Sequence, residues 1–125
     1  MNRKTQAAND PRTRAVRAGL ESDPTTGAVV PPIHLSSTFA FPSFGVKGRY
    51  DYSRSGNPTR DLVAEAVADL EGGAGAVVTG SGMGAIALVG QILKQGARIV
   101  VPHDCYGGTF RLFSAWQRRG DFRVE

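Results

Sequence analysis

A glycine-rich turn at residues 79–85 is the first feature of this sequence that could carry chemistry. It reads Thr-Gly-Ser-Gly-Met-Gly-Ala and stands between a short apolar run and a helical pattern. Glycines let a backbone turn tightly and approach a ligand closely. The free amides and the dipole at a helix start favour a phosphate, and Ser81 adds a hydroxyl group. The turn therefore predicts a phosphate site, although on its own such a stretch is equally typical of a plain tight turn.

One interpretation of the turn is the fingerprint of a dinucleotide-binding protein. Gly80, Gly82 and Ala85 match the pattern G-x-G-x-x-G/A after a strand. Asp104 follows the next strand, where an acid would bind the ribose. Against this interpretation, the pattern lies deep in the chain, whereas the fingerprint normally opens its domain. It also leaves residues 29–60 without a role.

A second candidate position follows the next apolar strand. Tyr106 lies there, at the carboxyl edge where open α/β sheets bind ligands. An aromatic ring at such an edge is usually part of the core. Gly107 and Gly108 beside it favour close approach of the backbone to a ligand instead. Arg111 is five residues further along, and read alone it is a solvated helix arginine.

The sequence predicts neither a metal site nor a cysteine nucleophile. His34 and His103 are far apart, and neither has a second ligand at metal-binding spacing. Cys105 lacks a His that could act as its base, so we expect a structural thiol. With one cysteine the chain forms no internal disulfide, which is typical of a reducing compartment such as the cytoplasm.

The elements that must position these residues begin at residue 58, where the pattern becomes regular. The predicted helices cover residues 58–71, 82–94 and 109–119, and the predicted strands cover residues 76–78, 98–101 and the beginning of a third at 122–124. Alternating strands and helices predict an α/β fold with a parallel sheet and right-handed crossovers. Two strands and a stub are only part of such a sheet, so we expect a truncated domain.

Residues 1–60 are of a different kind. They hold six of the seven prolines and show no helical or strand period of useful length. Such a segment cannot bury a core of its own. Its many apolar side chains are nevertheless unsuited to a free tail. We therefore expect an irregular N-terminal arm that packs on a partner surface.

Composition excludes several classes of partner. The 125 residues carry a formal charge of +4, much of it in the first 17 residues. No aromatic side chains interleave with these charges, so nucleic-acid stacking has no support. No apolar run approaches the ~18 residues of a membrane helix. We expect no nucleic-acid and no membrane partner.

Four segments in order resemble the γ-family of Cys/Met-metabolism pyridoxal-phosphate (PLP) enzymes. They read VVPPIHLSSTFAF, YDYSRSGNPTR, LEGGAGAVVTGSGMGAI and PHDCYGGTFRLF. The resemblance runs from about residue 14 to the last residue. It implies a partial three-layer α/β/α sheet of the aspartate-aminotransferase-like PLP-transferase large domain over residues 61–125. It also implies that residues 1–60 form an arm with cross-subunit contacts.

The resemblance implies roles for individual residues around the cofactor phosphate. Gly82 and Met83 would offer backbone amides to the phosphate, with Ser81 in the same cup. Tyr52 and Arg54 would reach across a dimer interface to the phosphate of the neighbouring subunit's cofactor. The segment that holds these two residues is, read alone, typical of a surface turn. An arginine suits the task because it forms a forked, charge-assisted pair with phosphate.

Further roles concern the pyridine ring and the substrate. The resemblance implies that Tyr106 stacks on the ring and assists proton transfer. Arg111 would bind the distal carboxylate of the substrate, with Tyr52 also near it. The implied substrates are amino acids and the implied assembly is a dimer of dimers. The implied reaction is γ-replacement, which makes cystathionine from an O-acylhomoserine and cysteine. Cleavage of cystathionine and sulfhydrylation of homoserine esters remain alternatives within the family.

Two groups that PLP chemistry needs are expected beyond residue 125. These are the lysine that holds the cofactor covalently and the acid that keeps the ring nitrogen protonated. Lys4, Lys47 and Lys94 are the lysines present, and none has the Ser-x-x-Lys-like setting of the family. We therefore expect the 125 residues alone to be inactive.

Overall fold

A computed structural model describes residues 10–20 and 23–125 of the chain. It divides into two compact units, Met1–Val78 and Thr79–Glu125, and each is considered by itself. The first nine residues, which include Arg3 and Lys4 of the basic start, lie outside the described residues. No helix in the described part of the chain has the length and apolar character needed to cross a bilayer.

The first unit begins with a short helix that the sequence pattern did not predict. Helix α2 covers Pro11–Arg17, and the Asp10 side chain caps it by accepting a hydrogen bond from the Arg12 amide at 2.8 Å. Seven residues are too few for a hydrophobic period to emerge, although Asp followed by Pro is a helix-start pattern. Arg14 joins α2 to the next helix through an Nε–Oδ2 ion pair of 2.8 Å with Asp69.

Helix α3 confirms its predicted bounds, Pro58–Glu71. Asn57 is the N-cap, and its side-chain oxygen accepts from the amides of Thr59 and Arg60. Pro58 stands in the first turn, where its fixed φ is favourable and its missing N–H is not needed. Gly72 ends the helix with a φ of 66°, in the left-handed region that glycine adopts at little cost.

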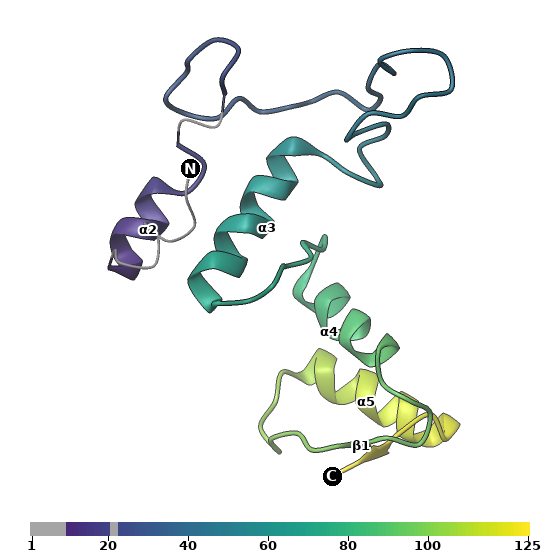
Figure 1. The fold of residues 1–125 in the computed structure, drawn as a ribbon. Helices are drawn as coiled ribbons and strands as arrows, with labels where there is room; N and C mark the ends of the chain where they lie inside the picture. The colour runs from purple at the N-terminus through teal and green to yellow at the C-terminus, as the bar shows by residue number, and fades with distance from the viewer. Residues whose placement is uncertain (1–9, 21–22) are drawn as a thin grey trace. The chain divides into compact units, whose positions relative to one another are not determined.

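The second unit contains two helices and a two-stranded parallel sheet (Figure 1). Helix α4 covers Gly82–Gln91, strand β1 Arg98–Ile99, helix α5 Gly107–Arg119 and strand β2 Arg123–Val124. The strands pair with Arg98 opposite Arg123 and Ile99 opposite Val124, which confirms the predicted parallel arrangement. Helix α5 packs against both β2 and α4. The fold is thus a partial α/β sheet with helical cover.

Two helix bounds differ from the prediction. Helix α4 ends three residues before Lys94, because the amides of Ile92 and Leu93 bond to carbonyls three residues back, at 3.2 and 3.3 Å, and so tighten the last turn. Gly96, with a φ of 78°, then turns the chain toward β1. Helix α5 begins two residues earlier than predicted, directly after Tyr106.

The predicted strand at residues 76–78 is wrong for this structure. Within the described residues these positions have no neighbouring strand, and a strand exists through its ladder of hydrogen bonds. Val77 is 73% exposed. The strand predicted at residues 98–101 is assigned only to Arg98–Ile99, but its pairing continues, since the Val101 amide donates to the Glu125 carbonyl at 2.8 Å.

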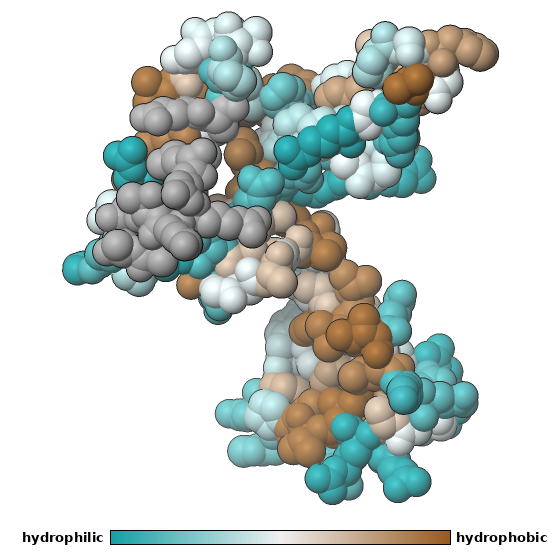
Figure 2. All heavy atoms as spheres, viewed as in Figure 1, coloured by the Kyte–Doolittle hydropathy of each residue, from teal (hydrophilic) through white to brown (hydrophobic). Residues whose placement is uncertain are grey.

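The interior is small in both units. Among the described residues, the buried positions in helices are Ala68, Gly90 and Thr109, and no large side chain is fully buried. Trp116 centres an aromatic cluster, with ring centroids 5.4 Å from Phe113 and 5.2 Å from Phe122. Apolar side chains are exposed in both units, as the brown surface in Figure 2 shows.

Candidate functional site

The glycine-rich turn is a structured start of helix α4. Ser81 is the N-cap, and its Oγ accepts a hydrogen bond from the Gly84 amide at 3.0 Å. Thr79 Oγ1 donates to the Ser81 carbonyl at 2.8 Å, which adds a second hydrogen bond within the turn. Because Ser81 Oγ accepts in this cap, its own hydroxyl hydrogen is still available to a ligand.

Two backbone amides at this helix start have room for an anion. In residues 10–20 and 23–125 no acceptor bonds to the amides of Gly82 or Met83. A Cβ placed on Gly82 would meet no atom within 4 Å, so the space beside the turn is open. First-turn amides are normally satisfied by a cap, water or a ligand. The turn therefore fits a small anionic group such as a phosphate.

Helix α5 starts beside helix α4. Thr109 Oγ1 donates to Met83 Sδ at 3.9 Å near the start of both helices. Seven residues further along each helix, the Trp116 ring lies over Gly90. The two helices therefore run parallel, with their N-terminal ends together (Figure 1). Each N-terminus carries roughly +0.5 elementary charge, so two positive ends lie at one place.

Tyr106 and Arg111 lie at this same end of the unit. Tyr106 is the N-cap of α5 and is 72% exposed, so its ring is not part of a core. A point at the position of a Cβ on Gly108 lies 2.6 Å from Tyr106 Cε1 and 3.0 Å from Met83 Sδ, so ring and thioether are neighbours. Arg111 Nη1 lies 3.5 Å from the matching point on Gly107, which places the guanidinium over the first turn of α5.

The structure thus brings the predicted residues of the second unit together. They share the end where α4 and α5 begin, and they are Ser81, Gly82, Met83, Tyr106 and Arg111. The set combines backbone donors, a hydroxyl group, an exposed aromatic face and a guanidinium. Such a set can bind a phosphate and hold a planar ring beside it.

Tyr52 and Arg54 form a pair of their own in the first unit. Arg54 Nη2 donates to the Tyr52 hydroxyl oxygen at 3.2 Å, and its guanidinium carbon lies 5.4 Å from the Tyr52 ring centroid. Both side chains are exposed. A short antiparallel bridge between Thr38 and Tyr52 fixes the backbone beneath them. The two exposed side chains thus contact each other, and the pair carries the positive charge of Arg54.

Asp51 supports this pair, and the sequence pattern did not single it out. The Lys47 ammonium at 2.9 Å, followed by the Ser55 hydroxyl at 2.8 Å, lowers the pKa of the Asp51 carboxyl to about 2. The same carboxylate accepts from the Tyr52 amide at 2.7 Å. Asp51 is therefore an ionised clamp that holds the backbone of Tyr52. The Lys47 to Asp51 spacing could have been noticed, but the fold of the loop could not.

Arg60 is a second supporting residue that sequence reasoning missed. Its Nη1 donates to the Ser53 carbonyl at 2.9 Å and its Nη2 to the Arg54 carbonyl at 3.3 Å. One guanidinium on α3 thus ties down the backbone on which Arg54 stands. Because planar guanidinium groups suit two acceptors at once, Arg60 fixes both position and direction of this loop.

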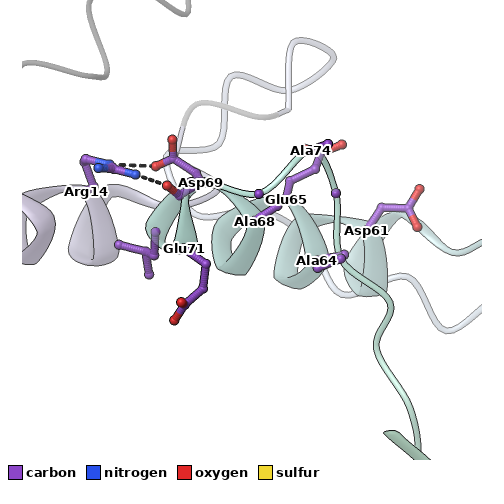
Figure 3. A pocket seen from close by; sticks show the side chains of 13 residues that line it. Arg14, Asp61, Ala64, Glu65, Ala68, Asp69, Glu71 and Ala74 are labelled. Atoms are coloured by element: carbon purple, nitrogen blue, oxygen red, sulfur yellow. Dashed lines mark hydrogen bonds and ion pairs between the residues drawn. The ribbon is translucent and has the colours of Figure 1, made fainter. Parts of the chain in front are cut away.

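A groove beside α3 contains none of the predicted site residues. Its volume is about 990 Å³, and Arg14 and residues 61–76 contribute its lining (Figure 3). The dashed lines in Figure 3 mark the bonds of Arg14 to the carboxylate and backbone carbonyl of Asp69. This ion pair joins two helices. Among the described residues, no cluster of His, Cys, Asp or Glu suits a metal ion.

Comparison with known proteins decides the family. Residues 12–125 match the Cys/Met metabolism PLP-dependent enzyme family. The chain belongs to this family. Cystathionine γ-synthase of Escherichia coli strain K12 is 58% identical over 113 residues, which are 90% of this chain and 29% of that protein. Cystathionine β-lyase of Coxiella burnetii is 47% identical over 107 residues, 86% of this chain and 28% of that protein.

A solved structure supports the same assignment. The crystal structure of cystathionine γ-synthase from Xanthomonas oryzae pv. oryzae, in complex with cystathionine, matches with a TM-score of 0.86 at 57% identity. The match covers 93% of this chain and 30% of that one. The chain thus spans less than a third of the length of these relatives. The fold is that of PLP-dependent enzymes of this family, as the four segments predicted.

Family membership also decides between the two interpretations of the glycine-rich turn. The family is PLP-dependent, so the comparison supports PLP, and not a dinucleotide, as the cofactor. The dinucleotide interpretation of Gly80, Gly82 and Ala85 is therefore wrong. Asp104, its proposed ribose ligand, is exposed in a turn of the β1–α5 connection.

Proposed function

We propose that this chain is part of a PLP-dependent transferase that makes cystathionine from an O-acylhomoserine and cysteine. The observation that carries the proposal is the shared start of α4 and α5, where two free amides lie beside an exposed tyrosine ring. When bound, PLP supplies an electron sink for negative charge that develops on amino-acid carbon atoms. The chain's own residues would bind and orient that group.

The phosphate would be held by the turn before α4. The amides of Gly82 and Met83 would donate to it, and Ser81 would add its hydroxyl hydrogen without losing its capping bond to Gly84. The dipoles of both helices favour the negative charge. Tyr106 would pack its ring on the pyridine ring and move a proton through its hydroxyl group. Arg111 would bind a carboxylate of the substrate, since its guanidinium lies at the same end.

Tyr52 and Arg54 would serve the site of a neighbouring subunit in a homo-oligomer, a dimer of dimers. Among the described residues, Arg54 has no carboxylate within ion-pair distance, so its charge is free for a phosphate. Tyr52 would contact the same phosphate and the substrate. We accordingly propose that residues 1–60 act as a cross-subunit arm and residues 61–125 as part of the PLP-binding domain, in a cytoplasmic enzyme.

A lyase is the second candidate, because the Coxiella burnetii relative is named as one and is 47% identical to this chain. The higher identity to the Escherichia coli synthase, 58%, favours synthesis. The residues of the site are compatible with either reaction, so the choice must be tested by activity.

A chimera gives the test. Residues 12–125 of this chain replace the matching segment of Escherichia coli cystathionine γ-synthase, and the parent enzyme is the control. We expect the purified chimera to form cystathionine from O-succinylhomoserine and cysteine. Efficient cleavage of cystathionine without synthesis would favour the lyase instead. Purification with stoichiometric NAD or FAD in place of PLP would contradict both.

A further inference from the structure

Gly108 occupies a position where a side chain has no room. A Cβ there would lie 2.6 Å from Tyr106 Cε1, 3.1 Å from Tyr106 Cδ1 and 3.0 Å from Met83 Sδ. Real Cβ contacts are essentially never shorter than 3.0 Å. The space that a side chain at position 108 would need is therefore occupied by the edge of the Tyr106 ring and the thioether of Met83.

The backbone does not need a glycine at this position. Gly108 is absent from the positive-φ glycines of the described residues and is the second residue of helix α5, with a helical conformation that alanine also adopts. Its φ does not require a glycine, so the space that it leaves for the Tyr106 ring is a physical reason for a glycine here, beside the close approach of the backbone to a ligand.

We infer that Gly108 is a positioning residue that sets the Tyr106 ring beside the amides of the anion site at the start of α4. The ring folds back over Gly108 and so lies next to Met83, whose amide is one of the two free donors. Thr109, which is 9% exposed, donates a hydrogen bond to the same Met83 sulfur and so holds the Met83 side chain at the contact between the two helices. This inference rests on the proposed function, because the ring that Tyr106 would face is that of PLP.

The neighbouring glycine supplies a matched control. A Cβ on Gly107 would lie 3.5 Å from Arg111 Nη1, which is ordinary contact with the end of a flexible side chain. Gly107 also has no positive φ and stands in the same helical turn. Gly107→Ala and Gly108→Ala therefore gain the same methyl group and the same helix propensity. They differ in whether that methyl group displaces Tyr106 and Met83.

The experiment compares these two variants in the chimera by the equilibrium Kd for PLP and by the absorption maximum of the bound cofactor. We expect Gly107→Ala to change the Kd and the absorption maximum less than Gly108→Ala does, because its methyl group meets only the end of the Arg111 side chain. Gly108→Ala should raise the Kd roughly 3- to 10-fold, the range expected for loss of one aromatic stacking contact, and shift the absorption maximum. Equal Kd values and spectra for the two variants would overturn the inference. An unsubstituted chimera that binds no PLP would instead overturn the proposed function.

A second background keeps the test decisive if Gly108→Ala impairs folding. Tyr106→Leu removes the ring that the new methyl group would strike, so Gly108→Ala should add little to the Kd in that background. The absorption maximum should likewise be the same for Tyr106→Leu with and without Gly108→Ala. An undiminished loss in the Tyr106→Leu background would show that Gly108 acts through the fold and not through the ring.

Discussion

The ring of Trp116 lies directly over Gly90, so that a Cβ placed on Gly90 would collide with the ring atom Cη2. This contact is what allows α4 and α5 to approach closely at the end remote from the site. The same tryptophan contacts Phe113 and Phe122, which connects the helix pair to the chain that enters β2. The close packing of the two helices therefore depends on a buried glycine near the end of α4.

Gly90→Ala should destabilise the chimera. Alanine favours a helix by about 1 kcal/mol over glycine, but overpacking a fitted contact costs about 1–3 kcal/mol, so we expect a net loss. The urea midpoint should fall relative to the unsubstituted chimera. Adding Trp116→Leu should make the Gly90→Ala effect smaller or reverse its sign. A midpoint that rises for Gly90→Ala alone would contradict the packing described here.

Arg54→Ala should weaken PLP binding by roughly 10- to 150-fold, since a hydrogen bond to a charged group contributes ~1.5–3 kcal/mol. Arg49→Ala is the control, because it removes the same charge from an exposed ion pair with Asp61 and Glu65. The measurement is the equilibrium Kd of the chimera for PLP.

Mixed dimers test whether Arg54 acts across the interface. Subunits with Arg54→Ala are combined with subunits that lack the catalytic lysine of the Escherichia coli portion. One intact site per mixed dimer should recover activity if Arg54 serves its neighbour. No recovery above that of the separate variants would mean that Arg54 serves its own subunit.

The Asp51 clamp should weaken in acid. The pKa of Asp51 in the folded chain is about 2, below its ordinary value of about 3.9, mainly because of Lys47. A depressed folded pKa contributes stability above the unfolded pKa and loses it as the pH falls through the folded one. The stability difference between the unsubstituted chimera and Asp51→Asn should therefore shrink between about pH 5 and pH 2.

A carboxyl titration by NMR checks this prediction. Lys47→Gln removes the ammonium group that lowers the pKa of Asp51 most, so this pKa should move back toward its ordinary value in that variant. An Asp51 carboxyl that titrates near its ordinary value in the unsubstituted protein would show that the Lys47 and Ser55 contacts do not persist.

Arg60→Lys should lower PLP affinity although Arg60 is not expected to touch the cofactor. A lysine cannot hold the carbonyls of Ser53 and Arg54 with one planar fork, so the loop that carries Arg54 should loosen. A Kd measurement should show a smaller loss than Arg54→Ala. In an Arg54→Ala background Arg60→Lys should add no further loss, and a fully additive loss would refute this indirect role.

Most of the fold that could be predicted followed from the hydrophobic periodicity of the sequence and from the residues that cap its helices. Helix α3 was predicted from Pro58 to the glycine at its end, because cap preferences are local. Parallel pairing of β1 and β2 followed from alternation of strands and helices. Helix α2 was missed because seven residues show no period, and the strand at residues 76–78 was overpredicted because pairing partners are not a local property.

The residues of the candidate site could be predicted from the sequence, but the contacts between them could not. Glycines before a helix and the Tyr106 position indicated a phosphate site with a ring beside it. The contacts that join them, Gly108 with Tyr106 and Thr109 with Met83, depend on how two helices pack. The supports of Arg54, which are Asp51 and Arg60, depend in the same way on the folded loop.

The central claim is that the start of α4 is a PLP phosphate site. Its most direct test is the position of the cofactor phosphate in an electron-density map of the PLP-loaded chimera. The account predicts phosphate oxygens at about 2.7–3.2 Å from the amide nitrogens of Gly82 and Met83, with the Tyr106 ring on the pyridine ring. A phosphate bound elsewhere, with these two amides facing water, would contradict it.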